Sequence, residues 1–334
     1  MKPRFAVIGL DHRHAFELTE LLIASGMDCA GYWTVTTDQR VLEGFQKRFP
    51  TLPAVADKDR LLDDPIIQVI VTAAVPRDRA GIAVAAMRRG KDVMADKPGV
   101  TTFAQLAEVE KTAAETGRIF SVCFSERFLT ASSDVALKLI RDGAIGRVVQ
   151  TLGTGPHRLN RAIRPDWFWE RDAYGGILVD IASHQIDQFI VFTGSERPEV
   201  AMASVGNFAT GGDFDDFGEI VLRSERARGY VRVDWFTPDG LPTWGDGRLT
   251  ILGTEGTIEM RKYIDIEGRP GTDHLFLADR KGTRHIACEG LPLSYFDAFV
   301  ADVKNRTETA MPQAHVFTVC RLALEAQAKA TPAP

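Results

Sequence analysis

The sequence predicts an α/β unit with a doubly wound parallel sheet, followed by an α+β unit with a large, open and mainly antiparallel sheet. In the first part of the chain, short apolar runs alternate with amphipathic stretches that stop at glycine or proline, as in repeated strand–helix units. Beyond about residue 125 this alternation ends, and strand-like runs follow one another across turns such as Asp239-Gly240. Because 334 residues exceed the usual size of one domain, we predict two, at residues 1–124 and 125–334.

The first predicted domain alternates strands with helices. Strands are expected at residues 5–8, 29–33, 69–74, 92–95 and 119–123, and helices at residues 15–25, 39–49, 79–89 and 103–116. The run at 69–74 is apolar at successive positions, which is typical of a parallel strand covered on both faces. Ligands of such sheets bind at the carboxyl ends of the strands, so the residues that follow each strand are the first candidates for a site.

The second predicted domain is dominated by strands. Helices are expected at residues 133–141, 177–192, 295–305 and 315–328, and strands at residues 147–154, 200–205, 217–223, 228–235, 248–252 and 257–260. The order of these runs indicates one open sheet with few helices.

Composition and charge restrict the class of protein. The net charge of −5 argues against a nucleic-acid or anionic-membrane partner, because both require a basic surface. No apolar run approaches the roughly 18 residues of a membrane span, and the N-terminus lacks the pattern of a signal peptide. The cysteines form no CxxC pair and are expected to be buried and reduced: Cys29, Cys123, Cys288 and Cys320. These features predict a cytoplasmic protein.

The stretch Gly9-Leu-Asp-His-Arg-His14 lies between the first strand and the first helix, where dinucleotide-binding folds carry their G-x-G-x-x-G turn. Glycine there lets the backbone approach a pyrophosphate, and the start of the helix supplies N–H groups. We therefore predict that Gly9, Asp11, His12 and Arg13 contact a cofactor. An ordinary strand–helix turn with a helix-capping aspartate remains the alternative.

Three further strand ends belong to the same predicted cofactor site. After the second strand comes Thr34, with no acid before Asp38, although NAD sites usually present a carboxylate here to the ribose. Ala74 and Pro76 follow the third strand, and Asp96 and Lys97 close the fourth. Hydroxyl groups followed by Arg40 are also compatible with a 2′-phosphate or with a plain loop.

The stretch Gly175 to Asp187 carries the sharpest pattern. Asp180, His184 and Asp187 are spaced to line one face of a helix, with apolar residues flanking them. A histidine can accept and return a proton near neutral pH, and a neighbouring carboxylate can orient its ring. One histidine with two acids is not a sufficient ligand set for a metal site, so we predict no metal. A satisfied polar cluster without catalytic function is the alternative.

A loop before that helix combines cations with aromatic rings. His157, Arg158, Arg164 and Trp167 are predicted to bind substrate, through its hydroxyls or an anionic group and through stacking on a sugar ring. A charged surface loop anchored by tryptophans is the alternative.

Taken together in this order, these stretches resemble the glucose-fructose oxidoreductase/inositol dehydrogenase/MocA (Gfo/Idh/MocA) family. Asp96-Lys97-Pro98 is similar to the family's Glu-Lys-Pro, and Gly175 to Asp187 is similar to its G-G-x-x-x-D-x-x-x-H-x-x-D helix. Gly143 to Gly146 and Gly253 to Glu259 resemble two of its structural turns, so the similarity covers nearly the whole chain.

The resemblance implies an N-terminal Rossmann domain and a C-terminal α+β domain whose open sheet joins subunits into a homodimer or homotetramer. It implies hydride transfer between a nicotinamide cofactor and a sugar, sugar derivative or cyclitol. The cofactor is NAD or NADP, with NAD preferred. By the same resemblance His184 is the general acid/base, Lys97 stabilises the developing alkoxide between nicotinamide and substrate, and Asp180 orients the substrate or the imidazole.

The chain departs from the family pattern on the cofactor side. Asp11 and His14 replace two glycines, the acid after the second strand is missing, and Pro76 to Ala80 lacks the family's Asn and His. Two other functions therefore remain open. One is an oxidation–elimination reaction that cleaves a glycoside and regenerates the cofactor. The other is a cofactor-free sensor or binding protein derived from the family.

Overall fold

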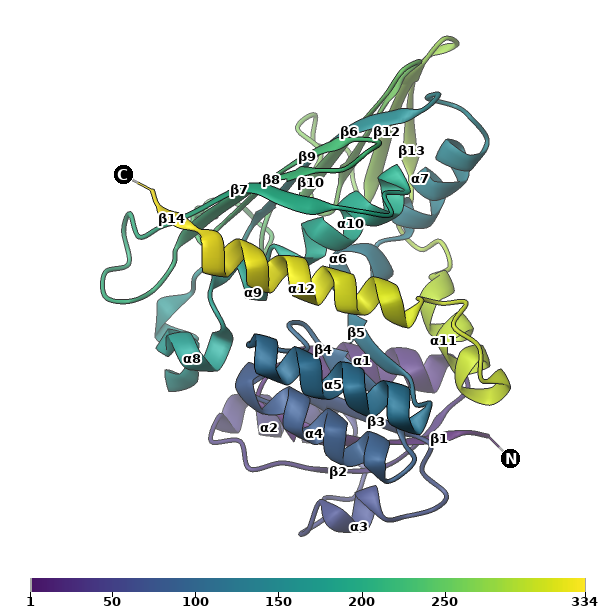
Figure 1. Cartoon of the computed structure of the whole chain (residues 1–334), viewed down its shortest axis with the longest axis vertical. Helices are drawn as coiled ribbons and strands as arrows, with labels where there is room; N and C mark the ends of the chain where they lie inside the picture. The colour runs from purple at the N-terminus through teal and green to yellow at the C-terminus, as the bar shows by residue number, and fades with distance from the viewer. Residues whose placement is uncertain (1, 334) are drawn as a thin grey trace. The chain divides into compact units, whose positions relative to one another are not determined.

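The computed structural model describes residues 2–333 and separates the chain into two compact units. The first unit contains the chain up to Cys123, together with residues 165–175 and 295–321. The second contains residues 124–164 and 176–294 and the chain from Leu322 onward. The boundary expected after residue 124 lies one residue beyond the end of the first segment, and two later segments also belong to the first unit. Figure 1 shows the elements of both units with their labels.

The first unit contains a parallel sheet with the strand order β2-β1-β3-β4-β5, which confirms the predicted doubly wound fold. Its strands are β1 (Arg4–Leu10), β2 (Asp28–Trp33), β3 (Val69–Ala73), β4 (Asp92–Asp96) and β5 (Phe120–Cys123). The strands β3, β4 and β5 are buried along their whole length, as expected for parallel strands covered on both faces. The strand order reverses between β1 and β3, where such sheets bind their ligands.

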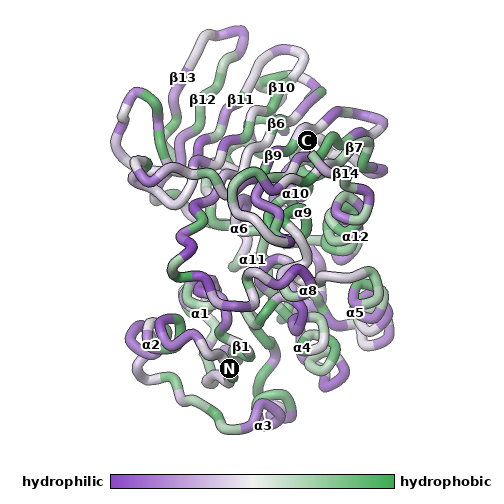
Figure 2. Tube along the Cα trace, turned by 90° about the vertical axis from the view of Figure 1, so that its left-hand side faces the viewer, coloured by the Kyte–Doolittle hydropathy of each residue, from purple (hydrophilic) through white to green (hydrophobic). Residues whose placement is uncertain are grey.

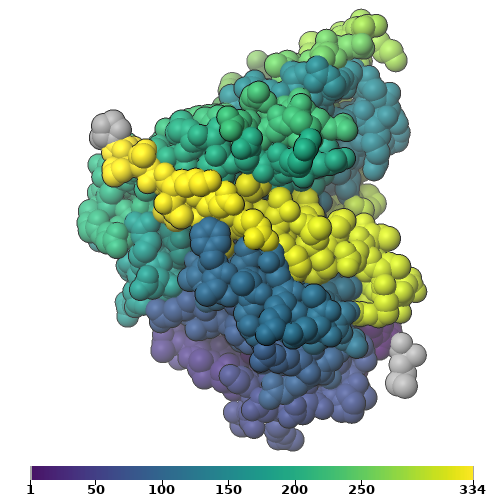
Figure 3. Space-filling view, in the orientation of Figure 1, coloured from purple at the N-terminus to yellow at the C-terminus, as the bar shows by residue number. Residues whose placement is uncertain are grey.

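Helices cover both faces of this sheet. They are α1 (His14–Ala24), α2 (Gln39–Arg48), α3 (Asp59–Leu62), α4 (Pro76–Arg88) and α5 (Phe103–Thr116). Figure 2 shows α1 and α2 on one side of β1, and α4 and α5 on the other. Later parts of the chain add η2 (Asp166–Trp169), α8 (Arg171–Tyr174), α11 (Ser294–Asn305) and the first half of α12 (Gln313–Lys329). Figure 3 shows surface formed by α11 and α12.

The second unit contains a mixed sheet with the order β13-β12-β11-β10-β6-β9-β8-β7-β14. Its strands are β6 (Val148–Pro156), β7 (Glu199–Gly206), β8 (Phe217–Arg223), β9 (Arg228–Asp234), β10 (Arg248–Gly253), β11 (Thr257–Arg261), β12 (His274–Asp279), β13 (Gly282–Ala287) and β14 (Thr331–Pro332). Neighbouring strands are antiparallel except for β6 with β9 and β7 with β14, which confirms the predicted mainly antiparallel sheet.

Helices cover one part of this sheet. They are α6 (Ser125–Phe128), α7 (Ala131–Arg141), α9 (Ile177–Asp180) and α10 (Ser183–Thr193), with the short η1 (Arg161–Ile163) in a loop. The helix α10 approaches β6 closely because two residues of β6 are glycines. A Cβ atom at Gly153 or Gly155 would lie 2.9 Å from the side chain of Gln185. These glycines therefore set the height of α10 above the sheet.

The structure corrects two features of the sequence interpretation. The helix predicted at residues 177–192 is two helices, α9 and α10, with a break between them. The Ala182 N–H bonds the carbonyl of Ile177, five residues back, and the His184 N–H bonds Ile181, three residues back, so the regular ladder is interrupted. The hairpin β12–β13 was not predicted; β13 is an exposed edge strand without the alternation of a half-buried strand.

Two properties of the whole chain complete the description. Within residues 2–333, no helix combines the length and the apolar character that crossing a bilayer requires. Every cysteine is a free thiol, and all are buried except Cys29, which is half-buried.

Candidate functional site

The turn after β1 lies against the end of β3 because Gly9 has no side chain. Gly9 has a φ of +88°, and a Cβ atom there would lie 2.5 Å from the Cβ of Ala74. The N–H groups of Asp11 and His12 both donate to the carbonyl of Ala73 at 3.0 Å. The predicted cofactor residues Gly9 and Ala74 are thus brought together at the position where the strand order reverses.

The side chain of Asp11 is half-buried in the turn between β1 and α1. It forms hydrogen bonds with the Thr36 side chain and the Val75 backbone. Burial raises the pKa of this carboxyl group, and these hydrogen bonds oppose the rise. The side chain that replaces the second glycine therefore ties the β1–α1 turn to two neighbouring loops.

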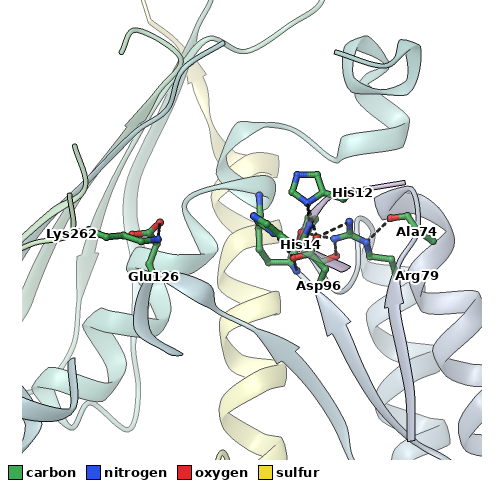
Figure 4. Close-up of polar contacts among 9 residues, drawn as sticks. His12, His14, Ala74, Arg79, Asp96, Glu126 and Lys262 are labelled. Carbon is green, nitrogen blue, oxygen red and sulfur yellow. Dashed lines mark hydrogen bonds and ion pairs between the residues drawn. The ribbon is translucent and has the colours of Figure 1, made fainter. Parts of the chain in front are cut away.

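Asp96, the last residue of β4, gathers three basic side chains of the first unit. His14 Nδ1 lies 2.8 Å from Oδ1, and His12 Nδ1 and Arg79 Nη2 lie 3.2 Å and 3.1 Å from Oδ2. Figure 4 shows these side chains converging on the carboxylate. Burial alone would raise the pKa of Asp96, but His14 and Arg79 hold that pKa well below its usual value. Burial and the neighbouring His14 lower the pKa of His12 to about 3, so its ring is neutral at physiological pH.

Arg79 is a structural residue that the sequence interpretation missed. It is 1% exposed, and its guanidinium donates to the carbonyls of Ala74 (2.8 Å), Lys97 and Pro98 (3.1 Å) besides pairing with Asp96. The sequence position of Arg79 could have identified it, because the residue lies in the first turn of the helix after β3, at the ligand-binding edge of the sheet. Arg79 fixes the backbone at Lys97 and Pro98.

His12, His14 and Asp96 form a cluster with the residue types of a metal site, but the charge of the Asp96 carboxylate is already neutralised by Arg79. Ligand atoms of His12, His14 and Asp96 all lie within 4.8 Å of one another. The Arg79 guanidinium occupies the same carboxylate, so a divalent cation would compete with a buried positive charge. The absence of a metal from this site stays a prediction.

The remaining cofactor candidates lie at the same edge of the sheet. The Thr34 hydroxyl accepts hydrogen bonds from the N–H groups of Leu10 (3.2 Å) and Thr36 (3.1 Å). Pro76 is the first residue of α4, and Arg13 precedes the first residue of α1. Asp38 caps α2, and its Oδ2 lies 3.2 Å from Arg40 Nη2. A glycine turn, the start of α1 and the carboxyl ends of β1, β3 and β4 together fit a dinucleotide.

Lys97 directly follows Asp96 in the sequence. It is 7% exposed, its N–H donates to Asp96 Oδ1 at 2.8 Å, and the Lys97–Pro98 peptide bond is cis. The backbone of Lys97 is therefore fixed on one side by Asp96 and on the other by Arg79. A lysine restrained in this way has a defined position at the end of β4, unlike a solvated surface lysine.

In the second unit, the break between α9 and α10 separates two predicted catalytic residues. Asp180 is the last residue of α9, and His184 lies in the first turn of α10. Both are buried, with His184 only 1% exposed. A shift of hydrogen-bond register at this place changes the direction of the two side chains relative to a continuous helix, and such irregularities are frequent at functional sites.

An ion pair that the sequence interpretation missed belongs to the surroundings of His184. Glu126 Oε1 lies 2.8 Å from Lys262 Nζ, with side chains 12% and 16% exposed (Figure 4). Burial alone would raise the pKa of Glu126, but Lys262, His184 and His157 lower that pKa to about 2. Glu126 could have been identified from the sequence, because it lies shortly after β5. Lys262 follows β11, and no pattern in the sequence distinguishes it from other lysines.

Asp187, the third member of the predicted polar face, has a structural partner. Arg127 donates from Nε to Oδ2 and from Nη2 to Oδ1, both at 2.7 Å, and Asp187 is fully buried. This bidentate pair joins α6 to α10. It holds Glu126, the neighbour of Arg127, beside the helix that carries His184.

The predicted substrate loop is held together by its own cations. Arg158 donates to the carbonyls of Pro238 (3.0 Å), Leu241 and Thr243 (3.1 Å). Arg164 donates to the carbonyls of Leu159 (2.7 Å) and Arg158 (3.0 Å).

Aromatic rings also contact this loop. The Arg164 guanidinium lies over the rings of Trp235 and Trp244, which also contact His157. Trp167 belongs to the first unit. That His157, Arg158, Arg164 and Trp167 contact substrate stays a prediction.

Family models cover most of this chain. Residues 4–124 match the model described as "Oxidoreductase family, NAD-binding Rossmann fold", and residues 135–259 match the GFO/IDH/MocA C-terminal domain. A solved structure of a putative oxidoreductase from Erwinia carotovora atroseptica is 43% identical, with each chain covered completely and a TM-score of 0.95. Levoglucosan dehydrogenase in complex with NADH is 20% identical, with 98% of each chain covered and a TM-score of 0.80, which is a likeness of fold.

Curated relatives match over shorter regions. Levoglucosan dehydrogenase of Pseudarthrobacter phenanthrenivorans is 30% identical over 42% of this chain and 37% of its own. The scyllo-inositol 2-dehydrogenase (NADP(+)) of Bacillus subtilis is 25% identical over 49% of this chain and 44% of its own. The chain thus spans about half the length or less of these relatives. Both family matches, the parallel sheet and the mixed C-terminal sheet lead to one conclusion: this chain belongs to the Gfo/Idh/MocA oxidoreductase family.

Proposed function

We propose that this protein transfers hydride between a nicotinamide cofactor, NAD or NADP, and a hydroxyl or keto group of a sugar, sugar derivative or cyclitol. The observation that carries the proposal is the buried, restrained Lys97 at the end of β4 in a chain that also buries His184 next to a helix break. Both residue types match the chemistry of alcohol oxidation, which requires a proton acceptor and a stabilised alkoxide.

In the proposed reaction, His184 accepts the proton of the substrate hydroxyl, and Lys97 stabilises the negative charge that develops on the oxygen. Asp180 orients the substrate or the imidazole. A bound nicotinamide supplies the hydride acceptor for oxidation and the hydride donor for reduction. The buried positions of His184 and Lys97 keep bulk water from these groups, which strengthens their electrostatic effect.

The cofactor residues in this proposal are those at the carboxyl edge of the parallel sheet. Gly9 allows close approach of the backbone, and α1 begins at this edge of the sheet, where the positive end of its helix dipole favours a phosphate. Hydrogen bonds with Thr36 and Val75 favour the charged form of the Asp11 carboxyl group. The family match over residues 4–124 favours a cofactor-binding enzyme over a cofactor-free binding protein. We propose NAD as the preferred cofactor.

The proposal includes the cellular setting. We infer a cytoplasmic enzyme, consistent with four free thiols. We further infer a homodimer or homotetramer joined through the nine-stranded sheet, whose exposed apolar residues include Leu152, Met202 and Leu252.

The first experiment is to denature the purified protein and identify released nicotinamide by mass spectrometry. Calorimetric titration of the stripped protein with NAD⁺ and NADP⁺ follows. Bound or micromolar-affinity dinucleotide would support the proposal and would distinguish NAD from NADP. No bound dinucleotide and no binding below millimolar concentration would contradict it and would favour a cofactor-free binding protein.

A further inference from the structure

The second unit contains a charged pair that the proposed chemistry does not use. Glu126 and Lys262 come from α6 and from the residue after β11, and their charged atoms lie 2.8 Å apart with little exposure to solvent. Removing two charges from water costs several kcal/mol, and an apolar pair of equal volume is often as stable. A buried pair next to a predicted catalytic histidine therefore suggests a role other than folding.

The pair belongs to the immediate electrostatic surroundings of His184 and His157. The charges of Lys262, His184 and His157 all act on Glu126 and together outweigh the burial that would raise its pKa. On α10, Gln188 lies one turn after His184, and its Nε2 donates to the backbone carbonyl of Glu126 at 3.4 Å. The Arg127–Asp187 pair fixes α6 to the same helix.

The carboxylate retains hydrogen-bonding capacity. One oxygen, Oε1, is bonded to Lys262, whereas within residues 2–333 no hydrogen bond reaches Oε2. A Cβ atom built at Gly247 would lie 3.2 Å from Oε2. Glycine at this position therefore leaves the space around Oε2 clear.

A polar cavity of about 20 Å³ adjoins the pair, enough for one water-sized group. Gln185 and Thr130 line it beside Glu126 and Lys262. Both side chains are buried, and within the described chain neither the Gln185 Oε1 nor the Thr130 Oγ1 has a hydrogen-bond partner. Buried polar atoms are almost always satisfied, so these atoms require a hydrogen-bonding group of the size of a water molecule or a hydroxyl at this place.

We propose that Glu126 and Lys262 form a substrate-recognition pair, in which the carboxylate binds hydroxyl groups and selects neutral polyols over anionic sugars. The inference rests on the proposed function. A hydroxyl can donate to Glu126 Oε2, whereas a substrate carboxylate or phosphate would face a like charge. Lys262 is already paired, and the guanidinium groups of Arg158 and Arg164 donate to backbone carbonyls, so these cations have partners within the protein.

The test compares matched neutral and anionic sugars on the cofactor-loaded protein. D-glucose and D-glucuronate differ only at one carbon, as do D-galactose and D-galacturonate. We expect the wild type to turn over the neutral member of a pair with the higher kcat/KM. Glu126→Gln should raise the ratio of anionic to neutral kcat/KM by at least about tenfold, because the repelling charge is gone while the shape is kept.

A control separates recognition from a general loss of structure. Glu259→Gln removes an acid of the same size from another ion pair of the same sheet, with Arg261 at 2.7 Å, and should leave the ratio unchanged. If Glu126→Gln fails to fold because Lys262 is left unpaired, Glu126→Gln with Lys262→Gln removes both charges. The ratio should still rise, but by less than in the single variant, because the attracting charge of Lys262 is lost together with the repelling charge of Glu126.

The outcomes distinguish this inference from the proposed function. Turnover of neutral sugars with an unchanged ratio in the Glu126 variants would overturn the recognition pair alone. A wild type that prefers the uronates would also overturn it. No nicotinamide binding and no turnover of any sugar would overturn the proposed function, and this inference with it.

Discussion

Arg127 and Asp187 join α6 to α10 through two parallel hydrogen bonds of 2.7 Å each, although 60 residues separate them in the chain. The carboxylate is fully buried and the guanidinium nearly so. This pair explains why the last aspartate of the Gly175 to Asp187 stretch is present: it holds the segment that carries Glu126.

We predict that Asp187→Asn destabilises the protein by about 3–5 kcal/mol, because it leaves the Arg127 charge buried without its counter-ion. Urea unfolding followed by circular dichroism measures this loss. Glu199→Gln, which breaks the exposed pair with Arg223, is the control and should leave the midpoint unchanged. An Asp187→Asn midpoint equal to that of the control would contradict the prediction.

Gly9→Ala should weaken dinucleotide binding by at least about tenfold and lower stability by more than the roughly 1–2 kcal/mol cost of a positive φ. The reason is the added Cβ, which would lie 2.5 Å from the Cβ of Ala74. Gly26→Ala is a close control: its φ of +89° matches the +88° of Gly9, but its Cβ would meet nothing within 4 Å. Calorimetry and urea unfolding give both quantities. Equal effects of the two substitutions would exclude the close approach as the cause.

Stability should fall on acidification from pH 6.5 toward pH 4. In the folded protein the pKa of His12 is lowered to about 3, so the unfolded chain binds a proton in this interval that the folded protein does not. The stabilising contribution is present above the unfolded pKa and is lost as the pH falls, by up to about 1.4 kcal/mol per pH unit. His12→Asn should flatten this slope in urea unfolding at a series of pH values. Identical slopes for variant and wild type would show that His12 protonates normally.

Lys97→Ala and His184→Ala should each lower turnover by at least about a hundredfold, the scale expected for electrostatic and acid–base groups. His184→Ala should retain the nicotinamide affinity of the wild type, which calorimetry measures. Folding is checked by circular dichroism. Activity of a folded His184→Ala variant within about threefold of the wild type would refute its role as acid/base.

A chelator should change neither nicotinamide binding nor turnover. Asp96 already bonds His14 and Arg79, so His12, His14 and Asp96 have no need of a cation. Dialysis against EDTA followed by calorimetry and an activity assay tests this. Loss of either property, restored by added Zn²⁺, would show that the cluster binds a metal.

Much of the fold could be predicted because it follows from local patterns. The apolar run that forms β3 indicates a strand, the glycine after α5 indicates a helix end, and Gly9 near the end of β1 indicates a turn, each from a few neighbouring residues. The hairpin β12–β13 was missed because an exposed edge strand lacks that pattern. The break between α9 and α10 was missed because two shifted hydrogen bonds leave the helical spacing of residues almost unchanged.

By itself, the sequence determined the order of elements, the two kinds of sheet and the candidates Lys97, Asp180 and His184, because periodicity and motif spacing are local properties of the chain. Only the tertiary structure decided the partners of the charged side chains. His14 and Asp96 are 82 residues apart, and Glu126 and Lys262 are 136 apart. Burial makes such pairing necessary, since a buried charge requires a counter-charge. Which charge supplies it depends on which strands and helices the fold places side by side.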